Sequence, residues 1–155
     1  MLDESFIEVY DKFKLQFYRK VFEQVRERDG SLSAMEAFSL EIIKALGEPT
    51  VGQFADFLSI SQSNATYKVN SLIRKGFLKR QNSQTDRREY HLILSDKFYH
   101  YEKLFSSYEK TVMDRILGRF PDEDVGVFDR MLQVISDELM PEVDEPPKSQ
   151  REMRV

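Results

Sequence analysis

The stretch that decides the fold is residues 61–76, which read SQSNATYKVNSLIRKG. Its apolar residues recur at spacings of four, three and one, which places them on one side of a helix with about 3.6 residues per turn. These residues are Ala65, Val69, Leu72 and Ile73. Ser61 can cap the first turn through its hydroxyl, and Gly76 can adopt the left-handed conformation that ends a helix. The sequence therefore predicts a helix with both ends marked.

The opposite face of this predicted helix contains no carboxylate, whereas an ordinary solvated helix face mixes Glu with Lys. Short hydrogen-bonding groups and cations are the partners that base edges and phosphate oxygens accept. The residues of this face and its flanks are Gln62, Ser63, Asn64, Thr66, Tyr67, Lys68, Asn70, Ser71 and Arg74. The pattern favours a nucleic-acid surface.

Composition narrows the class of protein. The chain has 155 residues, 41% of them hydrophobic, which suits one domain with a buried core. It contains no Cys, which excludes disulfides, thiolate catalysis and cysteine-ligated zinc. The N-terminus is acidic where a secretory signal is basic, and no apolar run approaches the roughly 20 residues of a membrane span. We therefore expect a cytoplasmic protein without a membrane segment.

Charge is distributed unevenly along the chain. The net charge is −4, yet residues 62–91 carry seven Lys or Arg against two Asp or Glu, so this segment is +5 and the remainder −9. A basic island in an acidic protein is the electrostatic signature of a nucleic-acid surface. The plainer alternative is a solvated, charge-rich hairpin.

Three helices are predicted before the central stretch. Aromatic residues at spacings of three and four predict a long helix over about 3–28. Its broad apolar stripe suggests a partner subunit, although packing within one subunit explains each single residue equally well. Capping boxes at Ser33–Glu36 and Thr50–Gln53 open a second helix and a short third one. Because three residues separate the third helix from residues 62–74, the two are expected to form a helix-turn-helix.

Two strands are predicted at 77–81 and 89–94, joined by a polar turn. A hairpin directly after a recognition helix is a wing, and this one carries Arg87 and Arg88 at its tip. An arginine there is thin enough to enter a narrow minor groove. Asp86 is expected to orient one arginine by a charge-assisted hydrogen bond, while the alternative is a plain turn residue.

The C-terminal third is predicted to be helical and then disordered. Ser95 with Asp96 can cap a helix running to about Phe120. Pro121 and the acidic residues after it suit the first turn of a final helix. Residues 141–155 have little apolar content, which predicts a disordered tail.

This order of elements resembles the MarR family of winged-helix transcriptional regulators, over roughly residues 5–140. The most specific part is residues 50–95, where several fixed offsets coincide. The matching positions are Ala55, Leu58, Ile60, Ser61, Leu72, Gly76, Asp86, Arg87, Arg88 and Leu92–Ser95.

The resemblance implies a mainly α fold with a small β-wing, in which a winged helix-turn-helix is flanked by long N- and C-terminal dimerisation helices. It makes residues 1–140 a single regulator domain, with a DNA-binding lobe at about 33–95 and dimerisation helices at about 3–28 and 96–140. It also implies a homodimer that places two recognition helices in successive major grooves of an inverted-repeat operator. Half-sites about 10 base pairs apart follow from that symmetry.

The resemblance also assigns roles to residues. Most of the outer face of the recognition helix would contact double-stranded DNA, and Arg88 would lie in a minor groove beside Arg87. The face residues that carry this role are Gln62, Ser63, Asn64, Thr66, Tyr67 and Lys68. Asn70 and Arg74 are added from the helical wheel and are expected to reach phosphates.

Relatives commonly bind small aromatic effectors in a crevice between the dimerisation helices and the DNA-binding lobe. The residues that could line it are Phe13, Phe17, Phe98 and Phe105. We favour the alternative, that most of these side chains are core. His91, His100 and Glu102 could bind a metal as in metal-sensing relatives, but solvent-exposed histidines are the simpler interpretation. No metal and no cofactor are therefore expected.

These observations predict a sequence-specific DNA-binding transcriptional regulator, specifically a repressor released by a small ligand. The alternative is a winged-helix module that binds another protein and not DNA. Enzymatic activity is not expected, because no nucleophile has a plausible base and there is no glycine-rich phosphate loop.

Overall fold

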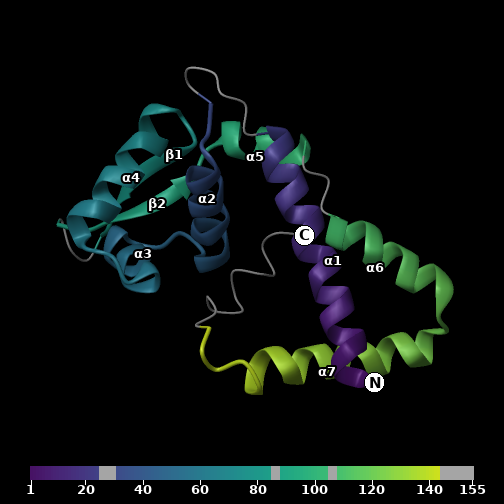
Figure 1. Cartoon of the computed structure of the whole chain (residues 1–155). Coiled ribbons are helices and arrows are strands. Elements are labelled where there is room, and N and C mark those ends of the chain that lie inside the picture. The colour runs from purple at the N-terminus through teal and green to yellow at the C-terminus, as the bar shows by residue number, and fades with distance from the viewer. Residues whose placement is uncertain (25–30, 85–87, 105–107, 144–155) are drawn as a thin grey trace. The chain divides into compact units, whose positions relative to one another are not determined.

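The computed structural model describes residues 1–24, 31–84, 88–104 and 108–143 (Figure 1). Contacts divide the chain into two compact units, residues 1–104 and 105–145. The first contains α1 (Leu2–Gln24), α2 (Ala34–Leu46), α3 (Val51–Leu58), α4 (Gln62–Arg74), β1 (Leu78–Asn82), β2 (Tyr90–Leu94) and α5 (Asp96–Leu104). The second contains α6 (Tyr108–Arg119) and α7 (Asp122–Glu138). The predicted class, mainly α with a small β-wing, is confirmed.

Local capping signals set the boundaries of α2 and α3. The side chains of Ser33 and Thr50 each accept a hydrogen bond from the backbone N–H three residues later. In return, the side chains of Glu36 and Gln53 accept from the backbone N–H of Ser33 and Thr50. Both predicted capping boxes are confirmed. Gly47 ends α2 in the left-handed conformation, at φ 66°.

The turn between α3 and α4 is tight. Ser59 adopts the left-handed conformation at φ 52°, and the Ile60 N–H donates to the Ala55 carbonyl at 3.1 Å. Ser61 then caps α4 by accepting from the Asn64 N–H at 3.2 Å. The predicted helix-turn-helix is present, with α4 as its second helix.

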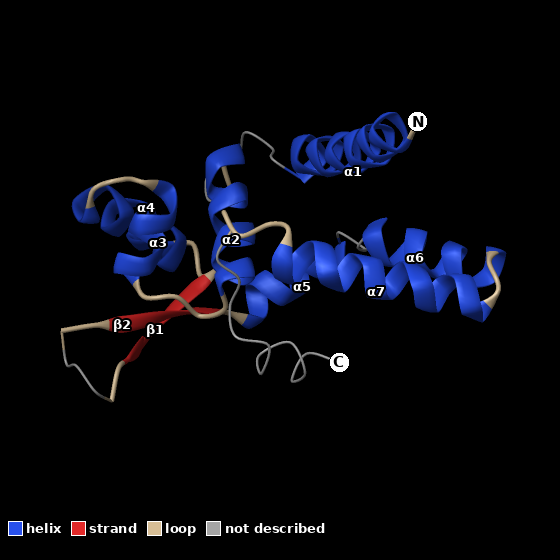
Figure 2. Ribbon diagram, turned by 90° about the horizontal axis from the view of Figure 1, so that it is seen from below, coloured by secondary structure: helices blue, strands red, loops and turns tan. Residues whose placement is uncertain are grey.

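The two strands form an antiparallel hairpin beside α3 and α4 (Figure 2). Leu78 pairs with Leu94 at its base and Asn82 with Tyr90 toward its turn. The other edge of β2 is occupied by the chain just before α3, because the Leu92 N–H donates to the Pro49 carbonyl at 2.8 Å. The wing is therefore tied to the helix-turn-helix through its backbone.

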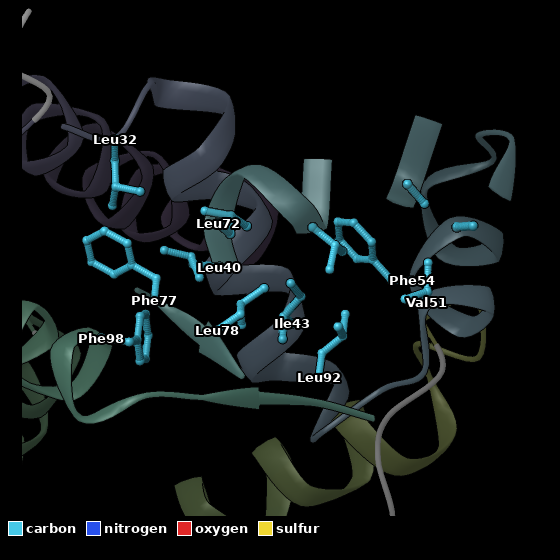
Figure 3. Packing of buried hydrophobic residues seen from close by; sticks show 13 residues of the cluster. Leu32, Leu40, Ile43, Val51, Phe54, Leu72, Phe77, Leu78, Leu92 and Phe98 are labelled. Atoms are coloured by element: carbon cyan, nitrogen blue, oxygen red, sulfur yellow. The ribbon is translucent and has the colours of Figure 1, made fainter. Parts of the chain in front are cut away.

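The core of the first unit collects one or two large side chains from each element between α2 and α5 (Figure 3). The largest fully buried side chains are Phe54, Phe98, Leu40, Ile43, Leu72, Leu78, Leu92 and Val69. Phe98 is fully buried, so its assignment to an open effector crevice is wrong and the core interpretation holds. Phe98, in the first turn of α5, belongs to the same cluster as Phe77 and Leu78 at the base of the wing.

The first helix packs on α2 through an aromatic contact. The rings of Phe17 and Phe38 lie 5.8 Å apart. The described helix covers Leu2–Gln24, and the end of the predicted range 3–28 falls on residues 25–28, which lie outside the described part of the chain. Many of its apolar side chains are exposed, including Phe6, Ile7 and Tyr10.

In the second unit α6 and α7 form a helical hairpin around Pro121. Asp122, Glu123 and Asp124 occupy the first turn of α7, as predicted. An open apolar pocket of about 380 Å³ lies between the helices. The predicted continuous helix over 96–120 corresponds to α5 and α6, while residues 105–107 are outside the described ranges.

Two further expectations concern the chain as a whole. The predicted disordered tail falls largely on residues 144–155, which also lie outside the described residues. Within the residues that are described, no helix is both long enough and apolar enough to cross a membrane.

Gly76 is expected to be required for its backbone conformation and not for space. It has φ 82°, and a Cβ added there would meet only Lys97 Cδ at 3.5 Å, an ordinary contact. Gly76→Ala should therefore lower the free energy of unfolding by about 1–2 kcal/mol through left-handed strain alone. Urea denaturation followed by circular dichroism measures this.

Gly52 provides the matched control. It is helical, and a Cβ there would meet its neighbours at 3.7 Å or more. Gly52→Ala should raise the free energy of unfolding by about 0.5–1 kcal/mol. Equal effects of the two substitutions would contradict the assignment of strain to Gly76.

Candidate nucleic-acid interface

The apolar and polar faces of α4 are separated as the sequence predicts. Ala65, Val69 and Leu72 are fully buried. On the other side the exposed residues are Gln62, Ser63, Asn64, Tyr67 and Arg74, while Thr66, Lys68 and Asn70 are half-buried. The Tyr67 side chain is 72% exposed, a large aromatic surface with no role in the core. Since residues 62–74 contain no Asp or Glu, this face carries only hydrogen-bonding groups and positive charge.

Hydroxyl groups near the start of α4 already make hydrogen bonds within this segment. The Thr66 hydroxyl donates to the Gln62 carbonyl at 2.8 Å, and the Ser61 and Ser63 hydroxyl oxygens lie 3.2 Å apart. A hydroxyl that donates its one hydrogen inward still has acceptor capacity. Thr66 can therefore accept from a base amino group without leaving its own bond.

Asn70 takes part in a contact that links α4 to the wing. Arg80 Nη2 on β1 donates to Asn70 Oδ1, and the Arg80 guanidinium lies 4.7 Å above the Tyr90 ring on β2. The helical wheel predicts that Asn70 reaches a phosphate. Its side-chain oxygen already accepts a hydrogen bond from Arg80. Its amide N–H groups are what it can offer to a ligand.

The structure corrects the placement of Ser71 on the outer face. Ser71 is half-buried, and its hydroxyl donates to Glu36 Oε1 on α2 at 2.7 Å. The helical wheel placed Ser71 near the edge of the polar face. The position of α2, which the wheel does not contain, determines that this edge faces the protein and not solvent.

Glu36 is the centre of a network at the last turn of α4. Besides Ser71, its carboxylate accepts from Lys75 Nζ at 2.7 Å and from the Ser33 N–H at 2.8 Å. Lys75 Nζ also donates to the Ser31 carbonyl at 2.8 Å. Burial alone would raise the pKa of Glu36, but the hydrogen bonds from Lys75, Ser33 and Ser71 outweigh it and hold the pKa below its ordinary value.

The wing is described only in part. Lys79 and Arg80 on β1 are exposed, as is Arg88 just before β2. Asp86 and Arg87 lie outside the described residues, so the expected orientation of an arginine by Asp86 stays a prediction.

The candidate residues for an effector crevice are described only in part. Phe13 is half-buried, Phe17 packs on Phe38, and Phe105 lies outside the described ranges. Together with the buried Phe98, this leaves the aromatic crevice a prediction for Phe13, Phe17 and Phe105 alone.

The possible metal ligands are also engaged elsewhere. His91 Nδ1 lies 2.8 Å from the Glu48 carbonyl oxygen, in a contact that is exposed to solvent. Glu102 accepts a hydrogen bond from Lys44 Nζ, and His100 is exposed. No group of three or more possible metal ligands occurs among the residues that the structure describes.

Sequence reasoning missed the tertiary roles of Glu36, Lys75 and Arg80. Glu36 was recognised only as a capping residue, and Lys75 and Arg80 only as members of a basic island. No local signal identifies their partners, which lie 39 and 10 residues away in the chain.

Comparison with known proteins agrees with this geometry. Residues 32–90 match the sequence profile of the MarR family. The HTH-type transcriptional regulator YkoM of Bacillus subtilis is 26% identical over 133 residues, covering 79% of this chain and 86% of that protein. The HTH-type regulator YpoP of the same organism is 36% identical over 75 residues, covering 45% of this chain and 53% of that protein. The match therefore spans about half the length of YpoP.

A solved structure shares the fold. Streptococcus pneumoniae FabT, crystallised in complex with DNA, has a TM-score of 0.59 and 23% identity, with coverage of 89% of this chain and 94% of that chain. At this identity the likeness concerns the fold.

Glu36→Gln is expected to lower the free energy of unfolding by about 1–2 kcal/mol at neutral pH, since a charge-assisted contact to Lys75 is lost. The pKa of Glu36 is depressed on folding, so its contribution is full above the ordinary value of 4.5 and is lost as pH falls through the lower folded value. The deficit of the variant should therefore shrink in acid, as measured by urea denaturation between about pH 7 and pH 3.

Gln53→Ala is the control, because it breaks the capping box of α3 without removing a carboxylate. Its deficit should stay constant over the same acid range. A Glu36→Gln deficit that does not change with pH would rule out the ion pair as its source.

Proposed function

We propose that this chain is a winged helix-turn-helix transcriptional regulator of the MarR family, and specifically a sequence-specific DNA-binding repressor that acts as a homodimer. The match of residues 32–90 to the MarR family and the likeness to YkoM support this proposal. In this proposal α4 reads base edges in the major groove and the wing reaches the flanking minor groove. Two copies bind the half-sites of an inverted repeat about 10 base pairs apart.

The observation that carries the proposal is the exposed face of α4. A helix face without carboxylates, with Tyr67 projecting into solvent and Arg74 at its C-terminal end, suits the donor and acceptor pattern and the charge of DNA. Gln62 and Asn64 supply planar amides, which pair with adenine in two hydrogen bonds. Lys68 can pack its stem and extend its ammonium to a phosphate.

Exposed apolar surface supports the homodimer. On α1 the exposed side chains include Phe6, Ile7 and Leu15, and Leu15 alone is 63% exposed. In the second unit, considered by itself, Leu117 and Met131 are 60% and 58% exposed. Helices that leave this much apolar surface in solvent are typical of an interaction site.

The proposed release by a small aromatic ligand rests on family resemblance. The described residues that could take part are Phe13 and Phe17, because Phe98 belongs to the core. An operator would supply the assay with which candidate ligands can be screened.

Selection from a random double-stranded DNA pool tests DNA recognition. At about 150 mM salt the wild type should enrich an inverted repeat, whereas a Tyr67→Ala, Arg88→Ala double variant should not. Phe57→Ala, which also truncates an exposed aromatic residue but on α3, is the control and should enrich the same repeat. If the wild type enriches no sequence and binding vanishes at this salt, the protein-interaction alternative becomes the better account.

The homodimer is tested by light scattering at micromolar concentration, where a dimer mass is expected. Phe6→Glu should raise the dimer dissociation constant by about tenfold or more, because it introduces a charge into an apolar contact. Lys12→Gln on the same helix, at an exposed position, should leave the constant nearly unchanged. A monomeric wild type at this concentration would exclude the dimer.

A further inference from the structure

Several elements converge on the C-terminal end of α4. From α2 and the residues just before it, Glu36 and the Ser31 carbonyl hold the Lys75 side chain. From the start of α5, Lys97 Nζ donates to the Lys75 carbonyl at 2.6 Å. The Ser95 hydroxyl donates to the Gly76 carbonyl at 2.6 Å. The end of the helix is therefore fixed in position by groups on both sides of it.

Among these groups Glu36 has the most connections to α4. It contacts α4 at Ser71 and the residue after the helix at Lys75, and the same carboxylate closes the capping box of α2. Its side chain is only 16% exposed, and its contacts with Ser71 and Lys75 are partly buried. A rotation or shift of α4 by one atomic diameter would break at least one of them.

We propose that Glu36 is a positioning residue for DNA recognition, which through Ser71 and Lys75 sets the orientation in which α4 presents its exposed face. This inference rests on the proposed function. Both oxygens of Glu36 already accept hydrogen bonds within the protein, and a carboxylate is repelled by phosphate, so we assign Glu36 no direct contact with DNA. Any contribution that it makes to sequence recognition acts through the placement of α4.

Simple electrostatics predicts the opposite effect of removing this carboxylate. Glu36→Gln removes one negative charge and releases the Lys75 ammonium. On charge alone it should tighten binding to every DNA sequence and steepen the salt dependence. Positioning predicts weaker binding to the operator and no loss on unrelated DNA. The two explanations therefore differ in sign.

The glutamine variant isolates the ion pair from the cap. A Gln at the third helical position can close a capping box, as Gln53 does on α3 of this protein. Glu36→Gln thus keeps the start of α2 and weakens the hold on Lys75. Lys75→Met removes the other partner, and Ser71→Ala removes one neutral hydrogen bond as a milder variant.

The experiment measures dissociation constants for the selected operator and for an unrelated duplex, over a range of salt concentrations. Glu36→Gln and Lys75→Met should each weaken operator binding by about tenfold, the ratio expected for one lost charge-assisted contact. Because both act through one contact, the double variant should be no weaker than the weaker single variant. Ser71→Ala should lose less, in the same direction.

Asp56→Asn is the matched control, since it removes an exposed carboxylate from α3. It should leave operator binding unchanged or slightly tighter. Circular dichroism checks that each variant is folded, and Ser71→Ala carries the test if Glu36→Gln does not fold.

The proposal is overturned if Glu36→Gln binds the operator as tightly as the wild type or tighter. Equal losses on both duplexes, or additive losses in the double variant, also overturn it. A wild type that prefers no sequence is a different result, because it removes the proposed function itself.

Discussion

The burial of one side of α4 is the constraint on which the interface depends. Ala65, Val69 and Leu72 are inaccessible to solvent, and they pack with side chains from α2, α3, the wing and α5. Because helical periodicity fixes the opposite side once this side is buried, the same packing determines which polar groups face solvent. The core and the recognition surface are thus two sides of one helix. A change in core packing that moves α4 therefore also moves the side chains on its exposed face.

The parts of the fold that the sequence predicts correctly are those governed by local signals. The capping boxes at Ser33 and Thr50 and the left-handed Gly76 depend on residues within a few positions of each other. The errors arise where distant segments meet. The edge of α4 at Ser71 turns toward α2, for a reason that periodicity alone does not contain.

The basic island also has more than one use. Lys75 is neutralised by Glu36, and Arg80 lies against Asn70 and Tyr90, so these two cations contribute to holding α4 and the wing together. Counting charges along the chain includes both of these cations among those available to a polyanion, although each already has a partner within the protein. The cost of removing two charges from water offsets much of the attraction in a partly buried ion pair. Its main effect is therefore to fix the arrangement of the two elements that it joins.

The hydrogen bond from the Leu92 N–H to the Pro49 carbonyl, at 2.8 Å, has a consequence for the order of folding. It joins segments that are far apart in sequence, whereas α2, α3 and α4 are built from short-range contacts with capped ends. Closing a long loop costs more chain entropy than forming a helix turn, so long-range pairings tend to form late. We expect the helices to assemble first and the wing to dock last. Thermal opening would then begin at the wing, while α4 keeps its helical shape.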